Sequence, residues 1–291
     1  MNWRRDSLIR RTVQFAFFAF IVYRSVLHSI GSASRVASLD SLCPMGGVAT
    51  FWNLVTMGRY VPKTHASNVV LLAGLGVSVL LAGGAFCGWM CPMGTLSDLL
   101  TSVRKRLRIG EIGIPNGVSR YLGLLRFVVL GAVLFETARL GTLVFANFDP
   151  YRAIFGLYWI FSPSSIGAIV WGTTVLVLAG MFLVDRFWCR FLCPLGAVIS
   201  LIQPLAIFKV RRDPELCINC GECSRVCPVK LPVDRRVSPG ATCAACMDCV
   251  SSCPVPGALY VGTAEGRFHN TESNTLTPSS APTGSHLAVR R

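Results

Sequence analysis

The chain has 291 residues, of which 52% are hydrophobic and only 14% are charged, and its mean hydropathy is +0.55. Soluble domains carry about 25% charged residues, so this composition excludes an ordinary soluble enzyme. The 28 Lys and Arg exceed the 14 Asp and Glu, which gives a net charge of +14. The basic residues are spread over the segments between apolar stretches rather than gathered with aromatic residues, so we expect no nucleic-acid partner.

Four apolar stretches are long enough, or nearly so, to cross a bilayer as helices, which takes roughly 20 residues. In chain order they are residues 12–30, 68–86, 121–145 and 166–184. Buried helices of a soluble core are the alternative, but the second and fourth stretches have no polar face to meet water. Two shorter stretches, residues 42–57 and 195–208, are expected to be interfacial or re-entrant.

The basic residues predict the orientation, because the cytoplasmic side of a membrane protein carries more Lys and Arg. The N-terminal segment and the segments after the second and fourth stretches together hold 14 of them, against five in the other two connections. We therefore expect a multi-pass protein of the inner membrane with both termini in the cytoplasm. A cleaved signal peptide over residues 4–23 is the alternative for the first stretch, and it leaves the side of every later segment unchanged.

Two of these stretches end in the same cysteine motif. Cys-Gly-Trp-Met-Cys-Pro at residues 87–92 recurs as Cys-Arg-Phe-Leu-Cys-Pro at residues 189–194, and Cys-Pro-Met-Gly at residues 43–46 is a partial third copy. Cysteines four apart lie on one helical face. They form one four-thiolate site, two redox-active dithiols, or free thiols that pack as small hydrophobic groups. The candidate redox or metal thiols are Cys87, Cys91, Cys189, Cys193 and Cys43.

A second, denser motif follows. Cys-x2-Cys-x2-Cys-x3-Cys-Pro occurs at residues 217–228 and again at residues 243–254. In bacterial two-cluster ferredoxins the first three cysteines bind one [4Fe–4S] cluster and the fourth binds the other. Zinc sites use two pairs of ligands, and disulfides are not expected in the cytoplasm. The predicted ligands are Cys217, Cys220, Cys223 and Cys253 for one cluster, and Cys243, Cys246, Cys249 and Cys227 for the other.

These motifs divide the chain into three parts. We expect a transmembrane domain over residues 1–212, a ferredoxin-type domain over residues 213–262 and a disordered tail over residues 263–291. The expected fold class is mainly α, with about four transmembrane helices followed by a small α+β domain of the 2[4Fe–4S] ferredoxin type. That domain is too short for a core of its own, so bound clusters must supply much of its folding energy, and its chemistry is one-electron transfer.

Apolar stretches that end in Cys-x3-Cys-Pro, followed by a double ferredoxin motif, resemble the membrane polyferredoxins. These include the NapH-type quinol dehydrogenase subunits, the MauN-type proteins and the membrane half of the NosR-type proteins, and the resemblance covers residues 12–261. It implies an electron-transfer component, rather than a stand-alone enzyme, between the quinone pool and redox partners or a second ferredoxin-type subunit. An electron-supplying assembly factor for a periplasmic metalloenzyme or quinone-cofactor enzyme is the alternative.

Ionisable residues within the apolar stretches are candidates for a quinone site, because charge in a bilayer is costly and marks function. His28 offers a hydrogen bond to a quinone, and Glu136 and Asp149 offer proton acceptors. Their structural alternatives are an interfacial histidine and a pair between Glu136 and Arg139, while Arg126 is expected to extend toward the interface. The apolar stretches lack a second histidine, so we expect no b-type haem.

Overall fold

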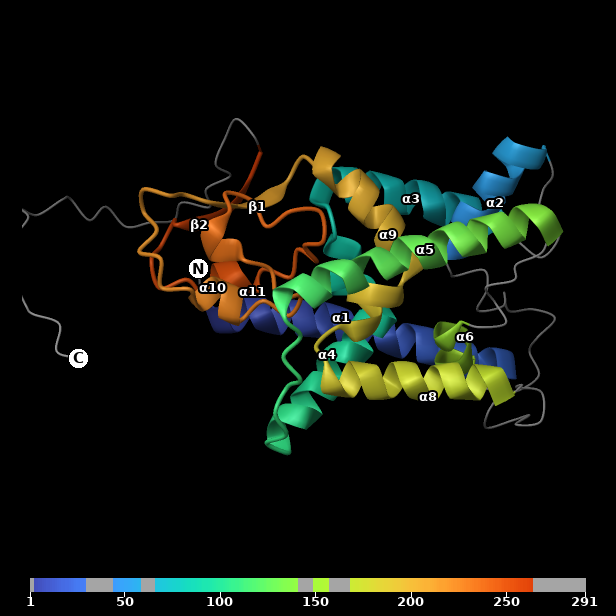
Figure 1. Ribbon diagram of the computed structural model, residues 1–291, viewed down its shortest axis with the longest axis horizontal. Helices are drawn as coiled ribbons and strands as arrows, with labels where there is room; N and C mark the ends of the chain where they lie inside the picture. Colours follow the sequence, from blue (N-terminus) through green and yellow to red (C-terminus); the bar gives the residue numbers. More distant parts are fainter. Residues whose placement is uncertain (1–2, 30–43, 59–65, 141–148, 157–167, 264–291) are drawn as a thin grey trace, which may run out of the picture.

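The computed structural model describes residues 3–29, 44–58, 66–140, 149–156 and 168–263 (Figure 1). Cys43 and the tail from residue 264 lie outside the described residues. Over the described ranges the chain is mainly helical and ends in a small ferredoxin region. The larger helices are α1 (Trp3–Ser29), α2 (Pro44–Met57), α3 (Ala66–Ala82), α4 (Pro92–Arg106), α5 (Asn116–Leu140), α6 (Pro150–Phe155), α8 (Ala168–Leu183) and α9 (Pro194–Ile202).

The four long apolar stretches of the sequence form helices α1, α3, α5 and α8, and the two shorter stretches form α2 and α9. Within the described ranges, length and hydropathy together identify one candidate membrane span, Gly117–Leu140 in α5. Helices α3 and α8 are apolar, but their described parts have only 17 and 16 residues. The predicted helices are therefore present, but only one of the described helices is long and apolar enough to qualify as a membrane span.

The two sequence repeats interlock rather than lie side by side. Helices α1, α4, α6 and α8 pack on one another in one layer, and α2, α3, α5 and α9 pack in the other (Figure 1). Each layer takes two helices from each repeat, because α1 to α4 belong to the first and α5 to α9 to the second. Exchanging equivalent helices converts one layer into the other, so the two Cys-x3-Cys segments meet between the layers.

Each repeat uses a proline to begin a helix. Proline suits the first helical position, where its fixed φ is favourable and its missing N–H costs nothing. The prolines that begin helices are Pro44, Pro92, Pro150 and Pro194. In the second repeat the side chain before each proline also acts as a cap: the Asp149 carboxylate accepts from the Tyr151 N–H at 2.9 Å, and Cys193 Sγ accepts from the Gly196 N–H at 3.3 Å.

The ferredoxin region follows the last helix of the second repeat. Strand β1 (Lys209–Arg212) pairs antiparallel with β2 (Leu259–Gly262), and the single-turn helices α10 (Glu222–Arg225) and α11 (Asp248–Ser251) lie between them in sequence. Two of the five buried residues of its apolar cluster are cysteines, and the others are Val210, Val233 and Leu259. So small a core stabilises little by itself, which agrees with a fold that depends on bound clusters.

The ferredoxin region packs directly against the backbone of two glycines that follow α3. A Cβ atom placed on Gly84 would lie 2.1 Å from the Cys243 carbonyl oxygen, and one on Gly88 would lie 2.2 Å from the Ala244 carbonyl oxygen. Both distances are far below van der Waals contact, and a carbonyl oxygen cannot rotate away as a flexible side chain can. Glycine is therefore required at both positions for this loop to dock.

We expect Gly88→Ala to lower the free energy of unfolding by about 1–3 kcal/mol, the usual cost of overpacking, and to loosen the ferredoxin region. Gly76→Ala in α3 is the matched control, because an added Cβ there meets nothing within 4 Å. Thermal unfolding of the anaerobically purified protein, followed by the visible absorbance of its clusters, measures both. Equal midpoints for the two variants would contradict the docking described here.

Candidate functional site

The first group of cysteines surrounds a cavity in the ferredoxin region. Cys217, Cys220 and Cys223 of the first motif line this cavity together with Cys253 of the second motif. Cys223 is buried, whereas Cys220 is exposed. Four cysteines around one cavity are the donor set that a [4Fe–4S] cluster needs.

The second group repeats this arrangement with the motifs exchanged. Cys243, Cys246 and Cys249 line a second cavity together with Cys227 of the first motif. In both motifs the loop between the first and third cysteines turns through two residues with positive φ. They are Asn219 (54°) and Gly221 (73°) in the first motif, and Ala245 (46°) and Met247 (64°) in the second.

Positive φ is uncommon for residues other than glycine, so this shared turn marks a loop shaped around a ligand. Each cavity thus receives three cysteines from one motif and the fourth from the other, as the sequence predicts, and the assignment of clusters to these ligands stays a prediction. Within the described part of the chain, no group of three or more His, Cys, Asp or Glu is placed to hold a single metal ion. A cubane differs in this respect, because it binds each thiolate to a separate iron.

Burial raises the pKa of Cys223 in the first cavity, and it raises the pKa of more thiols in the second. Burial raises the pKa of Cys246 to about 12 and raises that of Cys249 as well. At the exposed cavity a hydrogen bond from Arg212 lowers the pKa of Cys217. Thiolate is the form that binds iron, so cluster binding at the second cavity must displace protons from buried thiols.

The four cysteines of the repeat segments also come together. Cys87 and Cys189 lie in π-helical turns, η2 (Phe86–Met90) and η5 (Trp188–Leu192), and Cys91 and Cys193 directly follow these turns. The Cys87 thiol interacts electrostatically with the other three. Single π-helical turns are rare and occur frequently at functional sites. We call this group the thiol quartet.

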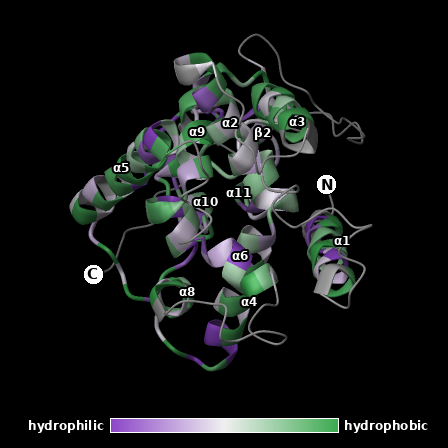
Figure 2. Cartoon of the chain, turned by 90° about the vertical axis from the view of Figure 1, so that its right-hand side faces the viewer, coloured by the Kyte–Doolittle hydropathy of each residue, from purple (hydrophilic) through white to green (hydrophobic). Residues whose placement is uncertain are grey.

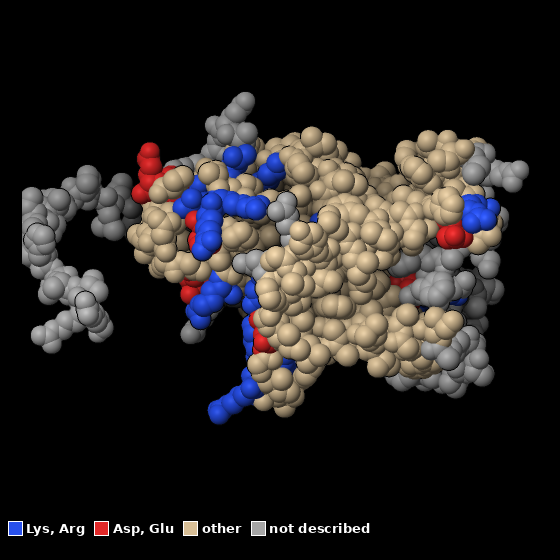
Figure 3. Space-filling model, viewed as in Figure 1, with Lys and Arg blue, Asp and Glu red and all other residues tan. Residues whose placement is uncertain are grey.

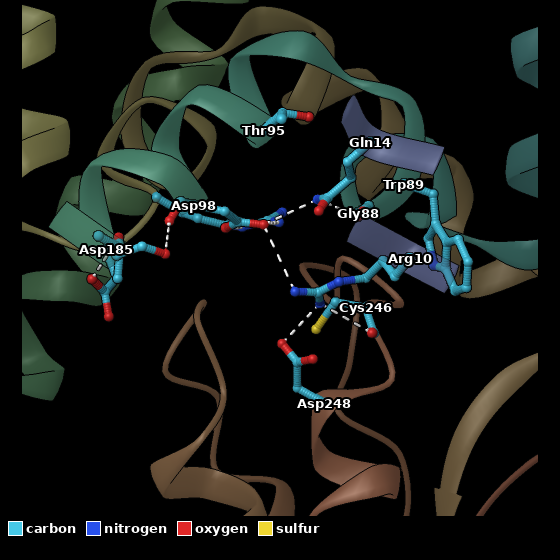
Figure 4. A network of polar contacts seen from close by, with 12 residues as sticks. Arg10, Gln14, Gly88, Trp89, Thr95, Asp98, Asp185, Cys246 and Asp248 are labelled. Atoms are coloured by element: carbon cyan, nitrogen blue, oxygen red, sulfur yellow. Dashed lines mark hydrogen bonds and ion pairs between the residues drawn. The ribbon is translucent and has the colours of Figure 1, made fainter. Parts of the chain in front are cut away.

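A polar bridge connects the thiol quartet with the second cavity, and Figure 4 shows its part from Asp98 through Arg10 to Cys246. Arg186 binds both carboxylate oxygens of Asp98, at 3.0 and 2.8 Å, and donates to the Cys87 carbonyl oxygen at 3.1 Å. On the other side of Asp98, Arg10 lies 3.9 Å from the carboxylate and donates to the Cys246 carbonyl oxygen at 3.1 Å. The backbones of two cysteine groups are thus held by one Arg–Asp–Arg arrangement.

Three further contacts complete the bridge. Gln14 donates to Asp98 at 3.0 Å and to the Gly88 carbonyl oxygen at 2.9 Å, and Arg10 binds Asp248 at 2.8 Å. Burial alone would raise the pKa of Asp98, but Arg186, Gln14 and Arg10 hold it below its ordinary value. The carboxylate therefore stays ionised.

The sequence analysis did not predict this bridge, because Arg10 and Arg186 served there only as basic residues that indicate the orientation in the membrane. The pattern that could have indicated it is a difference between the two repeats. At the positions of Gly84 and Gly88 the second repeat carries Arg186 and Arg190, so the two repeats differ where the loop docks.

The expectation that Arg126 extends toward the interface was wrong. Its side chain is 7% exposed and interacts electrostatically with Cys193 and Cys87. Helix α5 packs against η5, and this packing turns Arg126 toward the thiol quartet instead of toward the lipid boundary.

The candidate quinone-site residues lie on three separate helical segments. His28 belongs to α1 and Glu136 to α5, while Asp149 is buried and caps α6. Helix α6 and the C-terminal end of α5 lie at the opposite end of the helices from the ferredoxin region (Figure 1). Capping is a sufficient structural role for Asp149, and a quinone role for these residues stays a prediction.

Comparison with known proteins agrees with this chemistry. Residues 64–110 and 166–212 match a family model described as a 4Fe-4S binding domain, and residues 210–231 match a second model with that description. The chain is 29% identical to the candidate electron transport protein YccM of Escherichia coli K12, over 89% of this chain and 76% of that protein. No solved structure matches.

Two ferredoxin-type proteins are similar over most of their length. The methylamine utilization ferredoxin-type protein MauN of Methylobacillus flagellatus is 30% identical, over 77% of this chain and 76% of that protein. The ferredoxin-type protein NapH of Escherichia coli K12 is 28% identical, over 69% of this chain and 70% of that protein. The chain belongs to the family of ferredoxin-type 4Fe–4S membrane proteins that includes MauN and NapH. Its function within that family is iron–sulfur electron transport.

The exchange of the fourth cysteine between the motifs can be tested with three variants. We expect Cys253→Ser and Cys223→Ser to remove the same [4Fe–4S] EPR signal, because both thiols line the first cavity. Cys249→Ser should remove the other signal, although it shares a motif with Cys253. Loss of one common signal in the Cys253 and Cys249 variants would rule out the exchange.

We expect Asp98→Asn to destabilise the protein by about 3–5 kcal/mol, since it leaves buried Arg186 without its counter-charge. Because the fold lowers the pKa of Asp98, the carboxylate stabilises the wild type fully above pH of about 4 and loses this effect as the pH falls further. Glu222→Gln is the control, since it breaks an ion pair with Arg225 that is exposed. Thermal unfolding should separate the two variants clearly, and similar midpoints would argue against the role of the bridge.

Proposed function

We propose that this chain is a four-span protein of the inner membrane that passes electrons between the quinone pool and a redox partner through two cytoplasmic [4Fe–4S] clusters. The transmembrane domain covers residues 1–212, the ferredoxin-type domain residues 213–262 and the tail the remainder. The spans are α1, α3, α5 and α8, and the thiols lining the two cavities are the cluster ligands.

The surface of the helices supports this topology. Apolar side chains are exposed along the proposed spans, including Val70 on α3, Val128 on α5 and Leu176 on α8, which are 71%, 65% and 67% exposed. Coloured by hydropathy, α3, α5 and α8 are largely hydrophobic (Figure 2). In the view of Figure 3, Lys and Arg gather over the ferredoxin region and the neighbouring ends of the helices, while the middle of the helical part is almost free of charge. This pattern suits an apolar slab in lipid with the ferredoxin region on the cytoplasmic side.

The observation that carries the proposal is the contact between the second cavity and the membrane helices. Trp89 donates to the Ala245 carbonyl oxygen at 3.0 Å, and Gln203 donates to the Cys243 carbonyl oxygen at 2.8 Å. The second cavity therefore lies at the membrane side of the ferredoxin region, while the first cavity includes the exposed Cys220. Electrons would pass from the membrane to the second cluster, then to the first, and from there to a partner.

A cavity at the same junction suits a quinone head group. Its volume is about 260 Å³, its walls include Phe208, Ala241 and the cluster motif at Cys243, and Ser238 and Lys209 offer hydrogen-bond donors. Mostly apolar walls with a few polar groups are typical of small-molecule sites. A quinone here would lie directly beside the motif of the second cluster.

We expect added quinol to reduce two [4Fe–4S] EPR signals in lipid nanodiscs, or added quinone to oxidise them after reduction with dithionite. Ala241→Trp should slow this exchange at least tenfold by filling the cavity, while dithionite still reduces both clusters. Val237→Trp is the control, since Val237 is 52% exposed and is not part of that cavity. If the wild-type clusters exchange electrons with no quinone in either direction, the proposed function is wrong.

A further inference from the structure

We propose that the thiol quartet binds a third [4Fe–4S] cluster, shared between the two repeats. Its ligands are Cys87 and Cys91 from the first repeat and Cys189 and Cys193 from the second. The binding of iron stands independently of the proposed function, and only the role of this cluster as an electron relay rests on it.

The number of cysteines in each repeat is the first argument. Residues 64–110 and residues 166–212 each match a model described as a 4Fe-4S binding domain, yet each segment contains only two cysteines. A [4Fe–4S] cluster needs four thiolates, so neither segment can supply a complete set. The interlocked layers bring both pairs together. Cys91, Cys189 and Cys193 pack against one buried apolar cluster that includes Met93 and Trp188, and Cys87 interacts electrostatically with all three.

Buried positive charge around the thiol quartet is the second argument. Arg186 and Arg126 are 1% and 7% exposed, and both interact electrostatically with thiols of the quartet. Asp98 compensates Arg186, whereas Nε of Arg126 has no hydrogen-bond partner among the described residues. A buried cation is costly without an anion. A cluster with four thiolate ligands carries net negative charge and supplies that anion.

A backbone N–H group aimed at a sulfur atom is the third argument. Cys193 Sγ accepts from the Gly196 N–H at 3.3 Å. This donor belongs to the first turn of α9, where the helix dipole favours negative charge, and Cys91 occupies the equivalent position before α4. N–H donors to sulfur are a normal feature of iron–sulfur sites and help to set their potential.

The same geometry explains the glycine that follows each Cys-Pro. A Cβ atom on Gly94 would lie 2.6 Å from the Cys87 carbonyl oxygen, and one on Gly196 would lie 3.3 Å from the Cys189 carbonyl oxygen. Glycine thus lets the new helix fold back on the π-helical turn that carries the first cysteine of each pair. The whole motif, Cys-x3-Cys-Pro-x-Gly, is therefore needed to bring its two thiols to one site.

The position of the quartet suits a relay. Arg186 donates to the Cys87 carbonyl oxygen and interacts electrostatically with Cys246 of the second cavity. A cluster in the quartet would lie on the membrane side of the second cluster and accept or release one electron at a time, with no bond made or broken.

Iron and acid-labile sulfide in the anaerobically purified full-length protein test the proposal directly. We expect about twelve irons per chain, four for each of three clusters. Cys87→Ser and Cys189→Ser, which lie in different repeats, should each lower the count to about eight and keep both ferredoxin EPR signals. Met90→Ala is the control, because Met90 belongs to the same π-helical turn as Cys87 and is 36% exposed.

The wild-type count decides the outcome even if a cysteine variant does not fold. About eight irons in the wild type would overturn the proposal, as would a count that no quartet variant changes. About ten irons would indicate a two-iron centre and would overturn the cubane. Failure of quinones to exchange electrons with the clusters would overturn the proposed function and leave this count unaffected.

Discussion

The contact between the Cys243–Cys246 loop and the bare backbone of Gly84 and Gly88 is the constraint on which the rest of this structure depends. Backbone approaches backbone so closely that even one methyl group cannot be accommodated. The loop carries cluster ligands in the proposed assignment. This close approach therefore places the second cluster directly beside the helices, with no side chains between the two backbones. The hydrogen bonds of Trp89 and Gln203 to the same loop then fix its orientation. A rigid junction of this kind holds redox groups at constant separation, which a flexible linker cannot do.

The ferredoxin region makes this close backbone contact with only one of the two repeats, and the repeats differ in sequence at the docking positions. Equivalent helices exchange between the two layers, so an unmodified duplication would offer two docking places. The second repeat has Arg186 and Arg190 where the first has Gly84 and Gly88. A side chain of this size does not allow the close approach that Gly84 and Gly88 allow, and Arg186 instead reaches across to Asp98 and to the Cys87 backbone. The arginine at position 186 thus supplies a buried cation for the junction.

Local spacing explains what could be predicted from the sequence. The grouping of cysteines around two cavities follows from the distances between them along the chain, and the helical character of the apolar stretches follows from their composition. The bridge could not be predicted in this way, because Arg10 and Asp98 are 88 residues apart and meet only through the packing of α1 on α4. The error over Arg126 has the same origin, since the sequence places it near a helix end but does not say that η5 covers it. The number of membrane spans is also not determined by the helices alone, because it depends on which of them lie in the lipid.

Buried cations beside the cysteine groups favour the arrival of an electron. Arg10 and Arg186 are matched in number by the carboxylates of Asp98 and Asp248 in the bridge. Arg126, which is buried beside the thiol quartet, adds a further positive charge. Adding an electron to a cluster adds negative charge, and a nearby buried cation stabilises the reduced form because screening by water is weak. The first cavity is more open to water, since Cys220 is exposed and the nearby ion pair between Glu222 and Arg225 lies at the surface. Water screens charge there, so solvent exposure and hydrogen bonds to sulfur, rather than buried arginines, would set the potential of the first cluster. We therefore expect clusters at the two cavities to have their potentials set by different physical means, although the two cysteine motifs have the same spacing.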